Sequence, residues 1–167
     1  MLTKKESYNV AVVGATGIVG ESLLEILYSR RFPISSIHAV ASKKSKGSKA
    51  KFGDQLLTVE SLDEFNFTDI DIAFFSAGSS VSKEYATKAT TQGCIVIDNT
   101  SEFRYEQDIP LVVPEVNPQD IDLYKHKNII ANPNCSTIQM LVALKPLHDA
   151  FCVKHINVCT YQAVSGS

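Results

Sequence analysis

The chain has 167 residues, of which 44% are hydrophobic and 20% charged, and its formal net charge is −2. This composition fits one globular domain with a short appendage, and it excludes disorder, collagen and coiled coil. No apolar run reaches the roughly 20 residues that span a bilayer, and the small negative charge argues against general nucleic-acid binding. A domain of this length holds a core without disulfides or a structural metal. The four cysteines show no C-x-x-C spacing and the first residues lack the apolar stretch of a secretion signal, so we expect a reducing cytoplasm.

Short apolar runs rich in branched residues alternate with helical patterns, as βαβ units and a parallel sheet do. Strands are predicted at 8–13, 37–41, 72–76, 94–98, 128–131 and 155–161. Helices are predicted at 18–30, 82–92 and 136–151. The lysine-rich stretch 43–53 is interpreted as an exposed loop.

Glycines recur where the first predicted strand meets the first predicted helix. Gly14 can supply a tight turn, Gly17 lets the backbone approach a pyrophosphate, and Gly20 lets the helix pack near the strand. The N-terminus of the helix adds unpaired N–H groups that suit phosphate. We predict a dinucleotide site on a doubly wound, Rossmann-type α/β sheet; the alternative is a glycine-rich turn that binds nothing. The turn comprises Gly14, Ala15, Thr16, Gly17, Ile18, Val19 and Gly20.

The segment after the second predicted strand bears on the choice of dinucleotide. An acidic residue there would grip the ribose of NAD, but the segment 41–47 reads ASKKSKG and contains none. Its cationic and hydroxyl groups suit a 2′-phosphate, which predicts NADP. The alternative is a solvated lysine loop.

Cys135 stands between a predicted strand and the last predicted helix, flanked by the capping residues Asn134 and Ser136. A helix N-terminus stabilises a thiolate, so this cysteine is a candidate nucleophile; the alternative is a small buried hydrophobe. The other cysteines, Cys94, Cys152 and Cys159, are interpreted as packing residues. The four histidines are scattered, and no metal site is predicted.

Six segments, in this order, resemble the aspartate-semialdehyde dehydrogenase family. They are GATGIVG (14–20), FSAG (75–78), DNTSEFR (98–104), VVPEVN (112–117), PNCST (133–137) and TYQAVSG (160–166). The resemblance implies reduction of L-aspartyl-4-phosphate by NADPH to L-aspartate 4-semialdehyde and phosphate, through a thioester on Cys135. It also implies that Asn134 lies beside the nucleophile, that Gln162 orients the acyl group and that Arg104 binds the substrate's phosphate. Further coenzyme-binding residues implied by it are Ser42, Lys44, Ser45, Ser76, Ala77, Gly78, Asn99 and Gly166.

The resemblance also implies roughly as many residues again in a whole enzyme. On this basis residues 1–133 are expected to form the NADP-binding domain and 134–167 the truncated start of an α+β catalytic domain. The chain is then expected to be an N-terminal fragment with little turnover alone, from a cytoplasmic homodimer or homotetramer in lysine, threonine, methionine and diaminopimelate biosynthesis. The alternatives are an enzyme like N-acetyl-γ-glutamyl-phosphate reductase and a non-catalytic NADP-binding module.

Overall fold

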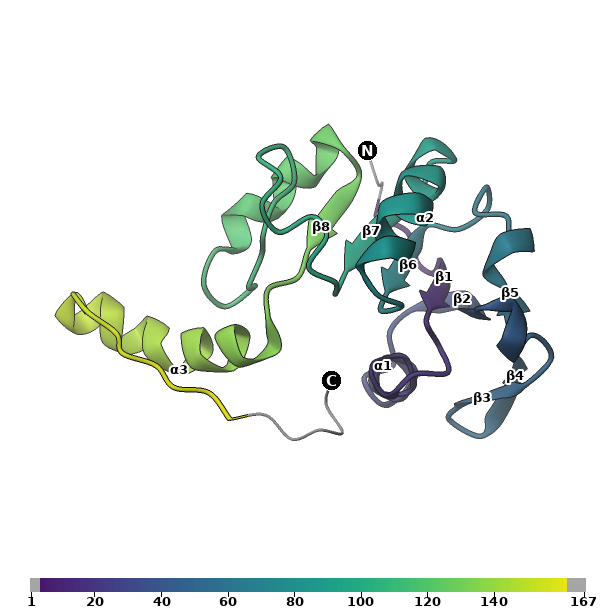
Figure 1. The fold of residues 1–167 in the computed structure, drawn as a ribbon, viewed down its shortest axis with the longest axis horizontal. Coiled ribbons are helices and arrows are strands. Elements are labelled where there is room, and N and C mark those ends of the chain that lie inside the picture. Colours follow the sequence, from purple (N-terminus) through teal and green to yellow (C-terminus); the bar gives the residue numbers. More distant parts are fainter. Residues whose placement is uncertain (1–3, 162–167) are drawn as a thin grey trace.

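The computed structural model describes residues 4–161 of the chain. Its main sheet has six strands in the order β5-β2-β1-β6-β7-β8, and all neighbours run parallel (Figure 1). The strands are β1 (Tyr8–Val13), β2 (Ile34–Ala41), β5 (Glu60–Ser61), β6 (Ile72–Phe75), β7 (Ile95–Asp98) and β8 (Ile129–Ala131). The first five predicted strands are confirmed as β1, β2, β6, β7 and β8.

The three predicted helices are also present. They are α1 (Ile18–Ser29), α2 (Ser79–Thr91) and α3 (Cys135–Phe151), and short 3-10 helices lie at η1 (Lys43–Ser45), η2 (Leu62–Glu64) and η3 (Pro118–His126). Only α2 starts clearly before its predicted first residue, Ser82. Gly78 adopts φ 95°, a conformation that glycine tolerates best, and the helix begins directly after it.

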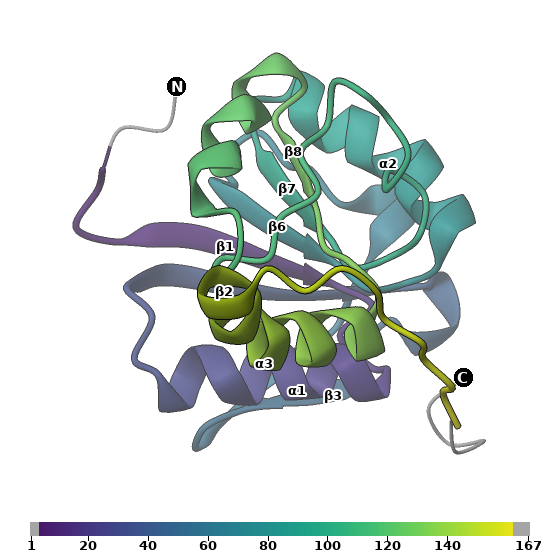
Figure 2. The ribbon, with the colours of Figure 1, turned by 90° about the vertical axis from the view of Figure 1, so that its left-hand side faces the viewer.

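The central strand β1 is apolar throughout because the sheet is covered on both faces. Val13 belongs to a cluster with Ala86 of α2, while the neighbouring Val12 belongs to a second cluster with Leu24 of α1. Successive side chains of a strand point to opposite faces, so α1 and α2 pack on opposite sides of the sheet (Figure 2). Full burial of a side chain such as Leu24 contributes about 1.5–3 kcal/mol. The doubly wound arrangement is therefore confirmed.

The interpretation of the lysine-rich stretch 43–53 as an exposed loop is wrong for much of its length. After η1, β3 (Lys49–Phe52) pairs antiparallel with β4 (Gln55–Thr58), and this hairpin packs against α1. Ala50 is buried, and the Phe52 ring meets Tyr28 edge-on with 5.5 Å between centroids. Lysines occupy the alternate, exposed positions of β3. Because these charged residues dominate the short segment, its sequence does not resemble a strand with one buried face.

The strand predicted at 155–161 is wrong, because the described part of this segment is irregular and exposed. Ile156 and Val158, which would pack in a sheet, are 47% and 54% exposed. A buried strand needs a partner for its backbone groups, and none pairs with this segment among residues 4–161. The packing interpretation of Cys152 and Cys159 is wrong for the same reason, since both are exposed; that of Cys94 is confirmed.

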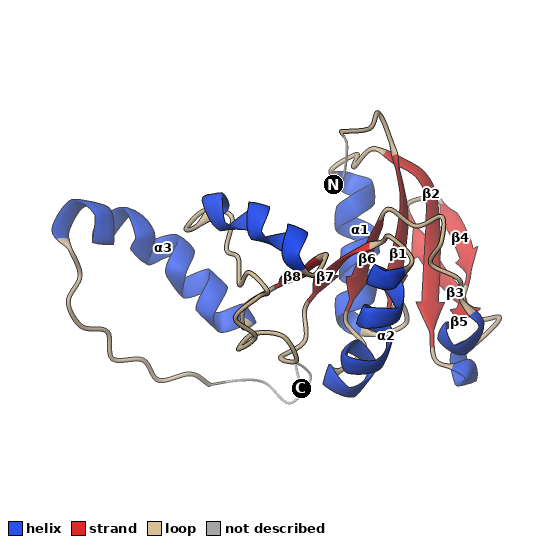
Figure 3. Cartoon of the chain, turned by 90° about the horizontal axis from the view of Figure 1, so that it is seen from above, coloured by secondary structure: helices blue, strands red, loops and turns tan. Residues whose placement is uncertain are grey.

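Helix α3 extends away from the sheet beyond β8 (Figures 1 and 3). It has no buried residue, although it is rich in apolar side chains. Within the range 4–161, no helix combines the length and the apolar character needed to cross a membrane.

Candidate functional site

The direction in which the sheet is built reverses between β1 and β6. The chain first moves outward through β2 and β5, and then crosses back to β6, β7 and β8. Ligands of open α/β sheets bind beyond the carboxyl ends of the strands at such a reversal. Gly14 follows β1 there and Ser76 follows β6. The Ser76 N–H and Oγ both donate to the Val13 carbonyl, at 2.9 and 3.1 Å, which joins the two strand ends.

Two glycines of the first turn are required by the fold itself. Gly14 has φ 91°, and a Cβ on it would lie 2.9 Å from Ser76. A Cβ on Gly20 would lie 2.1 Å from the Gly14 carbonyl oxygen, so this glycine allows α1 to pack on the turn. Ala15 is buried beneath the turn and Thr16 is exposed on it.

Gly17 is not required by its neighbours in the fold. A Cβ there would meet only the Gly14 oxygen, at an ordinary 3.5 Å, and its φ of −92° suits any residue. Gly17 precedes α1 without a side-chain cap, so first-turn N–H groups remain available to an anion. Ile18 and Val19 beside them are 69% and 50% exposed. The available N–H groups and the uncrowded Gly17 suit the phosphates of a ligand, and the exposed apolar side chains suit its rings.

The end of β2 presents the predicted 2′-phosphate residues. Ser42 and Lys44 are exposed, Ser45 is half-buried, and the Ser45 N–H donates to the Ser42 carbonyl at 2.9 Å. Lys46 forms an ion pair with Glu64 at 2.5 Å, and this ammonium holds the pKa of that carboxyl below its ordinary value. Lys44 has no such partner in the described part of the chain, so its charge remains available.

A cavity of about 270 Å³ lies between the start of α1 and the loops after β6 and β7. Its lining residues are Val19, Ser76, Gly78, Ser79, Asn99, Thr100 and Ser101. The structure thus gathers four of the predicted coenzyme residues, Val19, Ser76, Gly78 and Asn99, around one space. Ala77 lies between two of them and is half-buried.

Cys135 is the first residue of α3 and is exposed. The Asn134 Oδ1 accepts hydrogen bonds from the Ser136 N–H at 3.0 Å and from the Ser136 Oγ at 2.5 Å. The predicted capping role of Asn134 is therefore confirmed. This cap places the Cys135 thiol at the positive end of the helix dipole, shortly after β8 ends at Ala131.

Arg104 is half-buried and bonds the ends of two strands together. Its Nε donates to the Asn132 carbonyl and its Nη2 to the Asn99 carbonyl, both at 3.0 Å. Its Nη1 has no partner among residues 4–161. Arg104 thus anchors the backbone and keeps part of its guanidinium free for an anion.

Two polar residues that the sequence analysis did not select also hold this edge. The fully buried Asp98 carboxylate accepts hydrogen bonds from the Ser82 and Thr100 hydroxyls, at 2.6 and 2.7 Å. The Asn132 Nδ2 donates to the Asn99 Oδ1. Asp98 is the one charged residue of an otherwise apolar strand, and this could have indicated a buried polar contact from the sequence. The sequence around Asn132 carries no comparable signal. Gln162 and Gly166 lie outside the described residues and stay predictions.

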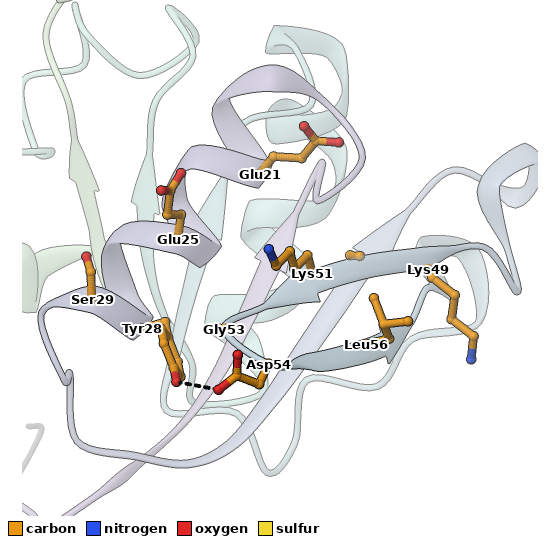
Figure 4. Close-up of a pocket in the computed structure, with 10 residues that line it drawn as sticks. Glu21, Glu25, Tyr28, Ser29, Lys49, Lys51, Gly53, Asp54 and Leu56 are labelled. Atoms are coloured by element: carbon orange, nitrogen blue, oxygen red, sulfur yellow. Dashed lines mark hydrogen bonds between the residues drawn. The ribbon is translucent and has the colours of Figure 1, made fainter.

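A larger cavity, of about 640 Å³, lies between α1 and the β3–β4 hairpin (Figure 4). Glu21 and Glu25 line it from α1, and Lys49 and Lys51 from β3. Its charges are of both signs and exposed to solvent. None of the predicted site residues lines it.

Comparisons with known proteins agree with the motif resemblance. A family model described as "Semialdehyde dehydrogenase, NAD binding domain" matches residues 9–124. An aspartate-semialdehyde dehydrogenase of Legionella pneumophila is 58% identical over 159 residues, which is 95% of this chain and 46% of the relative. The chain spans about half the length of the curated relatives it matches.

Solved structures agree on the fold. Aspartate semialdehyde dehydrogenase II from Vibrio cholerae, complexed with ASA, gives a TM-score of 0.84 at 53% identity, covering 86% of this chain and 47% of that one. The enzyme from Candida albicans, solved with NADP, gives 0.72 at 32% identity, covering 87% and 48%. The predicted Rossmann-type fold is thereby confirmed.

Proposed function

The chain belongs to the semialdehyde dehydrogenase family, whose NAD-binding domain model matches residues 9–124, and from this premise we propose that it forms the coenzyme site and supplies the nucleophile of an aspartate-semialdehyde dehydrogenase. The reaction would convert L-aspartyl-4-phosphate and NADPH to L-aspartate 4-semialdehyde, phosphate and NADP. The observation that carries the proposal is that the glycine turn, the 270 Å³ cavity and the Cys135 helix all follow the carboxyl ends of neighbouring strands.

The coenzyme in this proposal is NADP. The N–H groups at the start of α1 would bind its pyrophosphate, and Ser42, Lys44 and Ser45 its 2′-phosphate. The absence of an acid in the segment after β2 supports this choice, as does the Lys44 ammonium, which has no ion-pair partner within residues 4–161. When bound, the coenzyme supplies a hydride to the acyl carbon.

The Cys135 thiolate would attack the acyl carbon of the aspartyl phosphate. A carbon–sulfur bond forms, the carbon–oxygen bond to phosphate breaks, and phosphate leaves with the electron pair, so a thioester remains on the enzyme. Once the acyl carbon has been reduced, the carbon–sulfur bond would break, which releases the aldehyde and returns the electron pair to the Cys135 sulfur. The free Nη1 of Arg104 would bind the departing phosphate, since a guanidinium suits that geometry. The amide of Gln162 would orient the thioester carbonyl without adding charge.

The family resemblance extends the proposal to the whole enzyme. On its basis we propose a cytoplasmic enzyme of lysine, threonine, methionine and diaminopimelate biosynthesis that acts as a homodimer or homotetramer. In this proposal the acid–base histidine belongs to the half of the relatives that this chain does not span. An acid–base group typically contributes 10²–10⁴-fold, so we expect this chain alone to turn over very weakly.

Protection of thiols from alkylation tests whether Cys135 lies beside the coenzyme. The protein is treated with iodoacetamide with and without saturating NADPH, and each cysteine is followed by peptide mass spectrometry. We expect NADPH to slow alkylation of Cys135 and to leave Cys152 and Cys159, which are also exposed, unchanged. Cys94 should stay unmodified, since burial raises its pKa to about 12. NADPH binding with no effect at Cys135 would instead support a non-catalytic module.

The choice of NADP is tested separately by Lys44→Glu. A charge-assisted bond to phosphate contributes about 1.5–3 kcal/mol, so the variant should bind NADPH roughly 10- to 150-fold more weakly. NADH, which lacks the 2′-phosphate, should be affected far less. Calorimetric titration measures both, and Lys51→Glu on β3 serves as the charge-matched control. Equal losses for the two coenzymes would refute the assignment.

A further inference from the structure

Asn132, just after β8, makes three hydrogen bonds to residues that end or follow β7. Its N–H donates to the Asp98 carbonyl at 2.8 Å, and its carbonyl accepts from Arg104 Nε at 3.0 Å. The third bond runs from its Nδ2 to the Asn99 Oδ1. Only this third bond uses the side chain, so it can be removed without breaking the other two.

The side-chain bond fixes how Asn99 faces the coenzyme cavity. The Asn99 backbone is already held, since its N–H donates to the Phe75 carbonyl at 2.9 Å and its carbonyl accepts from Arg104. With its Oδ1 engaged by Asn132, the Asn99 amide presents its Nδ2 hydrogens, which have no partner among residues 4–161. Asn132 therefore determines that Asn99 offers donors to a ligand in the cavity that it lines.

The same residue is connected to the nucleophile by a short, stiff segment. Between Asn132 and Cys135 stand only Pro133, which is buried and has a fixed φ, and Asn134, which caps α3. A shift of Asn132 is therefore passed on to the start of the helix.

We propose that Asn132 is a positioning residue: through its amide bond to Asn99 it sets the distance between the coenzyme and the Cys135 sulfur. This inference rests on the proposed function, because it gives Asn99 and Cys135 the roles assigned there. Asn132 itself need not touch substrate or coenzyme.

The first test measures the segment without coenzyme. Asn132→Ala removes the amide bond and keeps both backbone bonds, so the melting temperature should change little. We expect exchange of the Ile138 amide, which donates to the Asn134 carbonyl, to become roughly three- to tenfold faster by NMR. Asn132→Asp is the matched control for this exchange measurement, because its carboxylate can accept from the Asn99 Nδ2 and restore a bridge, with the Asn99 amide turned over. If the Ile138 amide of Asn132→Ala exchanges at the wild-type rate, the proposal is overturned.

The second test measures the contact between sulfur and coenzyme. A thiolate against an oxidised nicotinamide ring gives a charge-transfer absorption band, which should appear when saturating NADP⁺ is added and disappear in Cys135→Ser. Asn132→Ala should lose at least about half of the band at saturation. A role limited to stability would leave the band unchanged in Asn132→Ala.

The two tests separate the possible failures. A wild-type protein that binds NADP⁺ without a band would contradict the proposed contact of Cys135, while amide exchange would still decide whether Asn132 holds the segment. A full-strength band in Asn132→Ala would overturn the positioning role and leave the proposed function standing.

Discussion

The three glycines of the first turn differ in what requires them. Added Cβ atoms at Gly14 and Gly20 would collide with neighbouring backbone, so the folded chain itself excludes larger residues there. At Gly17 an added Cβ meets no such obstacle. If the turn binds a pyrophosphate, Gly17 is needed by the ligand alone, which makes stability and binding separable.

Gly17→Ala is therefore expected to lower NADPH affinity at least about tenfold, because a methyl group keeps the backbone from the pyrophosphate. Its cost in stability should be no more than about 1 kcal/mol, for a poorer N-cap. Gly20→Ala should instead destabilise by about 3 kcal/mol, from overpacking against the Gly14 oxygen. Thermal unfolding and calorimetric titration measure both quantities. Normal NADPH binding by Gly17→Ala would contradict the assigned role.

Residues of the candidate site differ in how far the sequence could reveal them. The cap of α3 was predictable, because Asn134 acts on Ser136, two positions away. Asn132 was not, because its partner Asn99 lies 33 positions earlier and is reached only through the pairing of β7 with β8. Polar networks between strand ends depend on the register of the sheet, which one sequence does not reveal.

At the level of elements, Asp71 joins the beginnings of two neighbouring strands. Its carboxylate accepts from the Lys5 Nζ at 2.5 Å and from the Asn9 N–H at 2.9 Å, beside the pairing of β1 with β6. Burial opposes ionisation of this carboxyl, but the two donors outweigh it and hold its pKa below the ordinary value. A depressed pKa in the folded state means that the stabilisation is present above the unfolded pKa, near 4, and is lost as pH falls through the folded pKa.

Asp71→Asn should accordingly lower the free energy of unfolding at pH 7 by about 1.5–3 kcal/mol, the usual range for hydrogen bonds to a charged group. The difference from wild type should shrink as the pH is lowered below 4, where the wild-type carboxylate also becomes protonated. Urea unfolding at pH 7 and pH 3 measures it. Asp69→Asn is the control, since that exposed side chain has no carboxylate bond in the described structure. A constant difference at both pH values would contradict the linkage.

The elements that the sequence predicts well are strands that are buried on both faces, because their residues form continuous apolar runs. β1, β6 and β7 are nearly continuous apolar runs, and a sheet covered by α1 and α2 explains this pattern. β3 was hidden, because one face of the strand is charged and its other face is recognised only from its contact with α1. The segment 155–161 has an apolar pattern typical of a strand but no pairing partner among the described residues. The hydrophobic pattern of a segment predicts which faces of a strand would be buried, but the strands that pair with it are determined by the rest of the fold.

At the scale of the whole molecule, the sheet with its flanking helices and the helix α3 differ in how much of their apolar surface is buried. The sheet and its flanking helices bury two clusters, whereas α3 buries no residue and carries exposed apolar side chains. Leu147 and Phe151 are 49% and 79% exposed and lie one helical turn apart, so they share a face of α3. Apolar surface of this kind promotes association.

This contrast predicts that α3 can be changed without loss of the sheet. The double substitution Leu147→Ser and Phe151→Ser should alter the free energy of unfolding by no more than about 0.5 kcal/mol, because neither side chain belongs to the core. It should reduce binding of a hydrophobic dye and self-association in sedimentation, and leave NADPH affinity unchanged. Leu24→Ser, at a fully buried position, is the control that should unfold the domain. A loss of 2 kcal/mol or more in the double variant would mean that α3 packs on the sheet in solution, and the extended arrangement of Figure 1 would then be wrong.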